Sequence, residues 1–306
     1  MRKRGCVKKG SELLNNRSDP FVSSSRDRGG ECRKGSVPPV SKSKKRPAGR
    51  APKTPGKCVF CGGTGVTKEH IWADWIKNVI PGSPTNTQIT SYQMPDYSTK
   101  TLYVVPAAKE RQGRLDQRKI RNVCGGFNNG WMGRIVERAK PFVERMIQGM
   151  MVELDGGSQR DLATWIAIAT TMGEFMDVST AAIPPDDRRI VLTTEAPPEQ
   201  WTIFLGRYSG RTWHPIRYRH IGLKFNEIDL PGPRGSNDSN PDKMQVTTYA
   251  LGSLLIHAFS STSRRKVSRF RRSAAQKNLF RLWPLRHGVL DWPIGPILGD
   301  DEVPAF

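Results

Sequence analysis

Apolar residues recur at helical spacing in three parts of the chain, and each part predicts a helix. The first helix is predicted over residues 71–79 and ends at the turn that begins with Pro81. The second runs from about Trp131 to Met150 with an interruption near Pro141, and the third from about Gln159 to Asp177. The apolar faces predict that the second and third helices form a core.

Runs of β-branched and aromatic residues, bounded by turn residues, predict strands elsewhere. Residues 58–70 have the pattern of a tight β-hairpin that turns at Gly-Gly-Thr-Gly, and Thr101–Val105 is the best strand between residues 85 and 107. From about residue 188 the pattern is mostly that of strands, predicted at 189–194, 201–205, 212–218, 221–225, 244–250 and 254–259. The last two are predicted to pair across Gly252. The fold class predicted is α+β, with an antiparallel sheet in the C-terminal half.

Three regions follow from these patterns. Residues 1–57 carry 17 Lys/Arg against 4 Asp/Glu and little apolar periodicity, so they are predicted to be a disordered basic arm. Residues 58–180 hold the predicted helical core and the motifs described below. Residues 181–306 form a β-rich accessory region with a basic C-terminal segment.

The charge of the chain points to a polyanionic partner. The formal net charge is +21 and the isoelectric point is near 10.2, which favours nucleic acid first and an anionic membrane surface second. Two clusters are candidate phosphate contacts: Lys109, Arg111, Arg114, Arg118, Lys119 and Arg121, then Arg264, Arg265, Lys266, Arg269, Arg271 and Arg272. The first could equally be a solvated face, and the aromatic residues of the second could equally anchor it to the sheet.

Cysteine usage and hydropathy suggest a compartment. The five cysteines are an odd number, and three of them lie in knuckle-like settings, which suits a reducing compartment and metal ligation better than disulfides. Cys6 and Cys32 are isolated in the basic arm. Neither a membrane-spanning apolar run nor a secretory signal is evident. The sequence therefore predicts an intracellular, cytoplasmic protein without a membrane partner.

The candidate chemistry is concentrated in two stretches. Cys58-Val-Phe-Cys61 has the spacing of a zinc knuckle, and Glu69-His70 follows it. The second stretch is Cys124-Gly-Gly-Phe-Asn128-Asn-Gly-Trp. Phosphodiester hydrolysis needs a base that activates water, which an imidazole can be, and a hard cation that neutralises charge on the phosphate. On an extended segment the neighbours Glu69 and His70 point to opposite sides, so that each can serve one of these needs.

Taken together, these motifs resemble the HNH (His-Asn-His) endonuclease superfamily, and most closely its endonuclease VII-like, phage and bacterial members. The clear match covers residues 58–78 and 121–135. The resemblance implies a ββα-metal core with a structural zinc held by Cys58, Cys61 and Cys124. It further implies that Glu69 and Asn128 hold one Mg²⁺ or Mn²⁺ ion and that His70 is the general base.

One position departs from the family pattern. The second knuckle should be Cys-x-x-Cys, but Phe127 stands where its second cysteine would be. A structural zinc takes four ligands. Either zinc binds more weakly through three thiolates, or Phe127 packs apolarly where a ligand once lay.

The sequence thus predicts a metal-dependent endonuclease that hydrolyses DNA, with double-stranded DNA as its partner. Two alternatives stay open at this point. One is a nucleic-acid-binding protein without catalysis on a degenerate HNH or zinc-ribbon scaffold, and the other is an RNA-cleaving nuclease with the same site.

Overall fold

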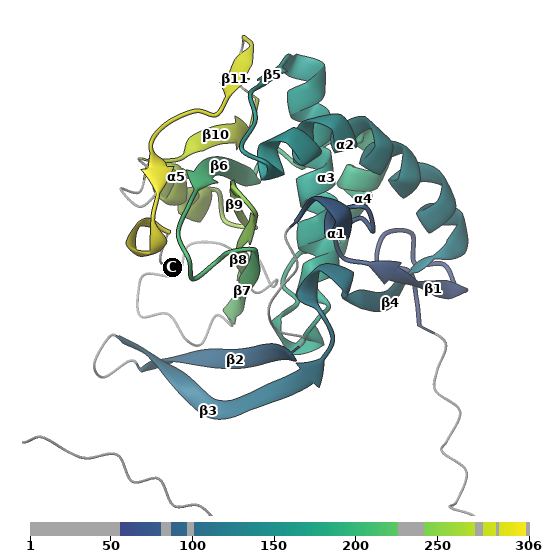
Figure 1. The fold of residues 1–306 in the computed structure, drawn as a ribbon. Coiled ribbons are helices and arrows are strands. Elements are labelled where there is room, and N and C mark those ends of the chain that lie inside the picture. Colours follow the sequence, from purple (N-terminus) through teal and green to yellow (C-terminus); the bar gives the residue numbers. More distant parts are fainter. Residues whose placement is uncertain are drawn as a thin grey trace, which may run out of the picture. The chain divides into compact units, whose positions relative to one another are not determined.

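The computed structural model describes residues 56–80, 87–96, 101–225, 242–272, 278–285 and 288–303 (Figure 1). Helices and strands are mixed along these residues, so the chain is an α+β protein as predicted. The predicted basic arm lies outside the described residues, apart from positions 56 and 57.

Two short antiparallel strands from distant parts of the sequence carry the first motifs. Strand β1 (Val66–His70) pairs with β4 (Lys119–Cys124), which places His70 opposite Lys119. The hairpin predicted within residues 58–70 is therefore wrong. Residues 58–61 form a turn instead, in which the backbone N–H of Cys58 donates to the Gly63 carbonyl at 2.8 Å.

The segment after β1 anchors this pair to the rest of the core. Helix α1 spans only Ile76–Val79, because Ile71 still donates its backbone N–H to the Arg118 carbonyl at 3.0 Å and so continues the ladder. The helix predicted from residue 71 is thus too long. Trp72 is fully buried, and its ring meets Tyr218 of the large sheet edge-on at 5.8 Å between centroids.

A two-stranded ribbon lies in the sequence between α1 and β4. It consists of β2 (Thr87–Asp96) and β3 (Thr101–Gln112), which pair antiparallel with each other. Strand β3 confirms the strand predicted at 101–105. The short helix η1 (Leu115–Gln117) then leads into β4.

The helix that follows β4 begins as a wide turn. Residues Phe127–Met132 form a π-helix, η2, which continues directly into α2 (Gly133–Ile147). The predicted interruption near Pro141 does not occur. Pro141 lies on the exposed side of α2, where the loss of one hydrogen bond is compensated by packing of the buried side. Met150 lies beyond the end of α2 and is 50% exposed rather than on its apolar face.

Helix α3 (Gly156–Glu174) confirms the third predicted helix and contacts α2. Its N-cap is Asp155, whose carboxylate accepts the backbone N–H of Ser158 at 2.7 Å. At its other end Glu174 is buried and accepts the backbone N–H groups of Ala182 and Ile183. Glu174 therefore holds the connection that follows α3, through the short helix η3 (Val178–Thr180).

Residues 189–194, predicted as a strand, belong to helix α4 (Pro185–Thr194). The prediction is wrong because it weighed the β-branched run and not the helix start before it. Pro185 stands at the first helical position, and Asp186 and Asp187 complement the positive end of the helix dipole.

The large sheet confirms the antiparallel architecture predicted for the C-terminal half. Its main path has the order β10-β6-β9-β8-β7, and β12 pairs parallel with β6. Gly252, with φ 54°, forms the predicted turn between β8 and β9. The two strands predicted at 212–218 and 221–225 belong to one strand, β7, but β7 begins only at residue 216, so the predicted strand start at 212 is wrong. The bounds are β6 (Thr202–Tyr208), β7 (Ile216–Phe225), β8 (Asp242–Leu251), β9 (Leu254–Ser261), β10 (Phe280–Trp283) and β12 (Ile297–Leu298).

The remaining elements lie around this sheet and the helices. Strand β5 (Val152–Leu154) pairs with β11 (Leu290–Trp292), helix α5 (Arg264–Arg271) contacts β9, and η6 (Asp300–Glu302) is the last described helix. One hydrophobic core includes side chains from before and after residue 180. The β1–β4 pair is thus fixed on the same core as the sheet.

Candidate functional site

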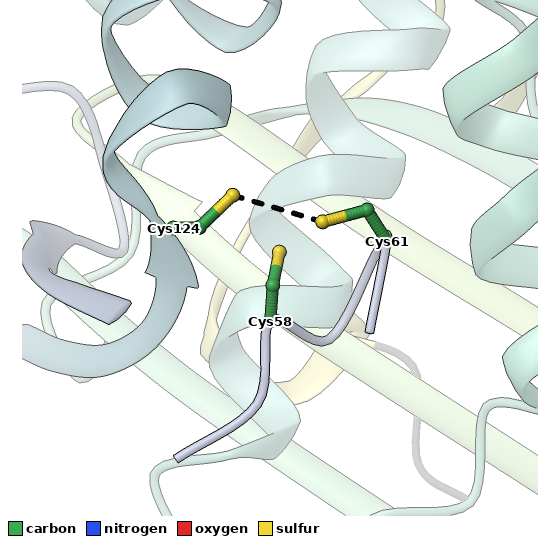
Figure 2. A group of neighbouring side chains, drawn as sticks. All are labelled: Cys58, Cys61 and Cys124. Atoms are coloured by element: carbon green, nitrogen blue, oxygen red, sulfur yellow. Dashed lines mark hydrogen bonds between the residues drawn. The ribbon is translucent and has the colours of Figure 1, made fainter. Parts of the chain in front are cut away.

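Three cysteines converge beside the β1–β4 pair. Cys58 and Cys61 lie on the turn before β1, and Cys124 ends β4 (Figure 2). Their sulfur atoms all lie within 4.8 Å of one another, and the Cys61 and Cys124 sulfurs are 3.6 Å apart. Zinc–sulfur bonds of about 2.3 Å place the sulfurs of a tetrahedral site about 3.8 Å apart. The cluster could therefore bind a single metal ion such as zinc.

Phe127 belongs to an aromatic group next to this cluster. Its ring lies parallel to that of Phe60 at 5.8 Å and is tilted against Trp131 at 5.2 Å between centroids. These contacts agree with the alternative that Phe127 packs against apolar neighbours at the position where the family has a cysteine ligand.

A pocket of about 720 Å³ is lined by residues of both motifs. Its walls come from the end of β1, from the turn after it and from the η2–α2 helix. Fourteen residues line it: Glu69, His70, Ala73, Asp74, Trp75, Asn128, Asn129, Gly130, Met132, Gly133, Arg134, Val136, Glu137 and Arg138. The three residues predicted for catalysis and metal binding are thus in one pocket.

Glu69 and Asn128 lie near each other in the pocket. The Asn128 side chain is close enough to the Glu69 carboxylate to lower its pKa, although the two residues come from β1 and η2. Burial raises the pKa of Glu69, and the hydrogen bonds from the His70 backbone and the Asn128 amide act against that rise. A half-buried carboxylate beside an amide provides two oxygen donors, the ligand type that hard divalent ions prefer.

His70 is held by the turn that follows β1. Its Nε2 atom lies 3.2 Å from Oδ1 of Asp74, and the other oxygen of Asp74 accepts from Lys77 at 2.6 Å. Burial lowers the pKa of His70, the nearby Lys119 ammonium lowers it further, and Asp74 raises it. These effects favour the neutral imidazole, the form that a general base requires.

Sequence reasoning missed several residues of this pocket. Asp74 could have been found from its spacing of four residues after His70. Arg134 and Glu137 could not, because their place depends on how the π-helical turn sets the register of α2. π-helical turns occur frequently at functional sites.

The first basic cluster is divided by the structure. Arg114 forms two hydrogen bonds to the buried carboxylate of Asp116, at 2.7 and 3.0 Å, and so has a structural role. Lys119 and Arg121 are exposed on β4, and Arg118 is partly buried. The side chains of Lys109 and Arg111 lie outside the described residues.

The second basic cluster is divided as well. Arg264, Arg265, Arg269 and Arg272 are exposed, and Lys266 is partly buried. Phe270 stacks on Phe259 of β9 at 4.0 Å, so this aromatic residue anchors α5 to the sheet. Arg271 donates to Thr202 Oγ1 and to the carbonyls of Glu199 and Trp201.

Arg271→Ala and Arg264→Ala are therefore expected to behave differently. The first should lower the free energy of unfolding by about 1–3 kcal/mol, because it leaves buried acceptors without their donor. The second should change stability by less than about 0.5 kcal/mol. Urea unfolding of both variants checks this, and equal stabilities would show that the contacts of Arg271 carry no weight.

The chain was compared with protein families, curated proteins and solved structures. No family model, curated protein or solved structure matches the chain. Within the described residues, no helix is both long and apolar enough to cross a bilayer. The function proposed below rests on the chain's own residues.

Proposed function

We propose that the chain is an HNH-type endonuclease that hydrolyses DNA phosphodiester bonds with one divalent ion, Mg²⁺ or Mn²⁺. The observation that carries the proposal is the meeting of Glu69, His70 and Asn128 in the lining of one pocket. The order of two antiparallel strands followed by a helix, β1, β4 and η2–α2, supports a ββα-metal core.

The residues divide the chemistry between them. Glu69 and Asn128 would hold the divalent ion through oxygen, and the ion would supply positive charge to the phosphate and the leaving oxygen. The Asn128 amide carries an oxygen and a nitrogen, so a rotation of the side chain by half a turn would direct the oxygen to the ion. His70 would take the proton from the attacking water.

Asp74 would act as a positioning residue for His70. With its Nε2–H directed at Asp74, the neutral imidazole keeps the lone pair on Nδ1 to accept a proton. Lys77 holds Asp74 in turn through its second oxygen. The pair Asp74–Lys77 thus fixes the tautomer that the reaction needs.

The three thiolates would hold a structural zinc beside this site. Phe127→Cys is expected to tighten zinc binding about tenfold or more, because it adds a thiolate at the knuckle spacing and completes four ligands. Competition for zinc with a chromophoric chelator measures this. Unchanged affinity would show that position 127 is not the missing ligand, and Phe127→Leu controls for the loss of the aromatic ring.

Binding of Mn²⁺ tests the ion site without reference to cleavage. Electron paramagnetic resonance should show one Mn²⁺ bound by the zinc-loaded protein, and Glu69→Gln should weaken it about tenfold or more. Equal binding by both proteins would remove Glu69 from the ion site. A panel of DNA and RNA substrates then separates a deoxyribonuclease from a ribonuclease, and DNA binding without cleavage of either would favour the non-catalytic alternative.

A further inference from the structure

The pocket beside Glu69 and His70 offers more than a phosphodiester needs. Its volume of about 720 Å³ is large enough for a nucleotide, and the pocket is open to solvent. Part of its wall is apolar, formed by Ala73, Trp75, Met132 and Val136. A phosphate group alone would gain nothing from such a wall, whereas a nucleobase or a deoxyribose would.

Trp75 is the residue of this wall that can bind a base. Its side chain is half-buried, because part of it packs against the main hydrophobic core, and it lines the pocket together with Asp74, which holds His70. Lys140, which does not line the pocket, places its ammonium 5.9 Å from the centroid of the ring and so helps to fix it. Stacking on an aromatic side chain stabilises a bound base by about 1–3 kcal/mol and tolerates any sequence.

Arg134 provides the charge that a nucleotide would need in the same pocket. The other arginine of the lining, Arg138, is engaged by Asp161 at 2.9 Å and by Glu195. No ion pair of Arg134 is found among the described residues, and its side chain is exposed at the pocket. Arg134 and Val136 both lie on α2 and both line the pocket, so this helix supplies a charge for a phosphate and part of the apolar wall.

We propose that this pocket binds one unpaired nucleotide next to the cleaved bond, with its base on Trp75 and a phosphate on Arg134. The proposal rests on the proposed endonuclease function for the place of the cleaved bond. In a continuous duplex both faces of a base are covered by its neighbours, and extruding a base costs a few kcal/mol. The substrate class is therefore nucleic acid with single-stranded, bulged or frayed nucleotides rather than fully paired duplex.

Binding in EDTA tests this without cleavage. The probes are oligonucleotides of equal length with 2-aminopurine at one position: a single strand, a duplex with a one-nucleotide bulge and a fully paired duplex. The first two are expected to bind about tenfold or more tightly than the paired duplex, and their 2-aminopurine emission should be quenched by stacking. Trp75→Leu, which keeps an apolar side chain, should abolish the preference and the quenching, whereas Trp75→Phe should keep both.

Arg134→Ala should weaken binding of all three probes, and Arg189→Ala, at an exposed arginine of α4, is the matched control. Circular dichroism confirms that each variant is folded. Equal affinity for paired and unpaired probes, or a preference that survives in Trp75→Leu, would overturn the proposal. A preference with no cleavage in Mg²⁺ would leave the pocket standing and remove the endonuclease function, while cleavage of paired duplex without a preference would do the opposite.

Discussion

His70→Ala is expected to abolish DNA cleavage while leaving the protein folded and bound to DNA. The general base contributes about 10²- to 10⁴-fold to such a reaction, so the rate should fall by that factor. The side chain is only 13% exposed but lies at the rim of a pocket, and its loss leaves the core formed by Trp72 and Ile76 in place. Single-turnover cleavage of a saturating substrate measures the rate without the binding step.

The matched control for this variant is His214→Ala. His214 is exposed, and it does not line the pocket. This variant should cleave at the rate of the wild type. A His70→Ala protein that also cleaves at that rate would show that another group activates the water.

Cys58→Ser is expected to remove the bound zinc and to lower the free energy of unfolding by about 4 kcal/mol or more. Cys58 is only 3% exposed, and the three thiolates join the turn before β1 to the end of β4. Metal binding to such a site contributes directly to folding, and its loss belongs to the few changes with effects of this size. Zinc content and thermal unfolding, with and without a chelator, measure both effects.

Cys32→Ser is the control, because the sequence places no second cysteine at knuckle spacing from it. It should keep the zinc content and stability of the wild type. If Cys58→Ser is as stable as the wild type and a chelator has no effect on either protein, the cluster is not a metal site.

The pocket shows what the sequence could predict and what it could not. The short Cys58–Cys61 spacing marked half of the cysteine cluster by itself. The approach of Cys124 to these two, across 63 residues from Cys61, and of Asn128 to Glu69 was implied only by the family resemblance. The partner of β1 was not predicted, since β4 lies far along the chain and nothing in the local pattern of residues 58–70 distinguishes a hairpin from two strands with distant partners. Tertiary pairing decided the choice.

The helices show the same difference between what local sequence patterns predict and what tertiary packing decides. Helix α3 is long and strongly periodic, and its prediction needed no tertiary information. Helix α4 was missed because its β-branched residues outweighed the start signal at Pro185, and Pro141 was given too much weight as a helix breaker on an exposed face. Arg134 and Trp75 entered the pocket only through the packing of these elements, which no spacing in the sequence encodes.

The measurement that tests the central claim most directly is nicking of supercoiled plasmid by the wild-type protein in Mg²⁺, in Mn²⁺ and in EDTA, with DNA binding followed in the same samples. Glu69, His70 and Asn128 share one pocket, so the account predicts nicked product with either ion and none in EDTA, while binding persists in all three. Folded, zinc-loaded protein that binds DNA in a salt-sensitive manner but cleaves neither DNA nor RNA with either ion would contradict it.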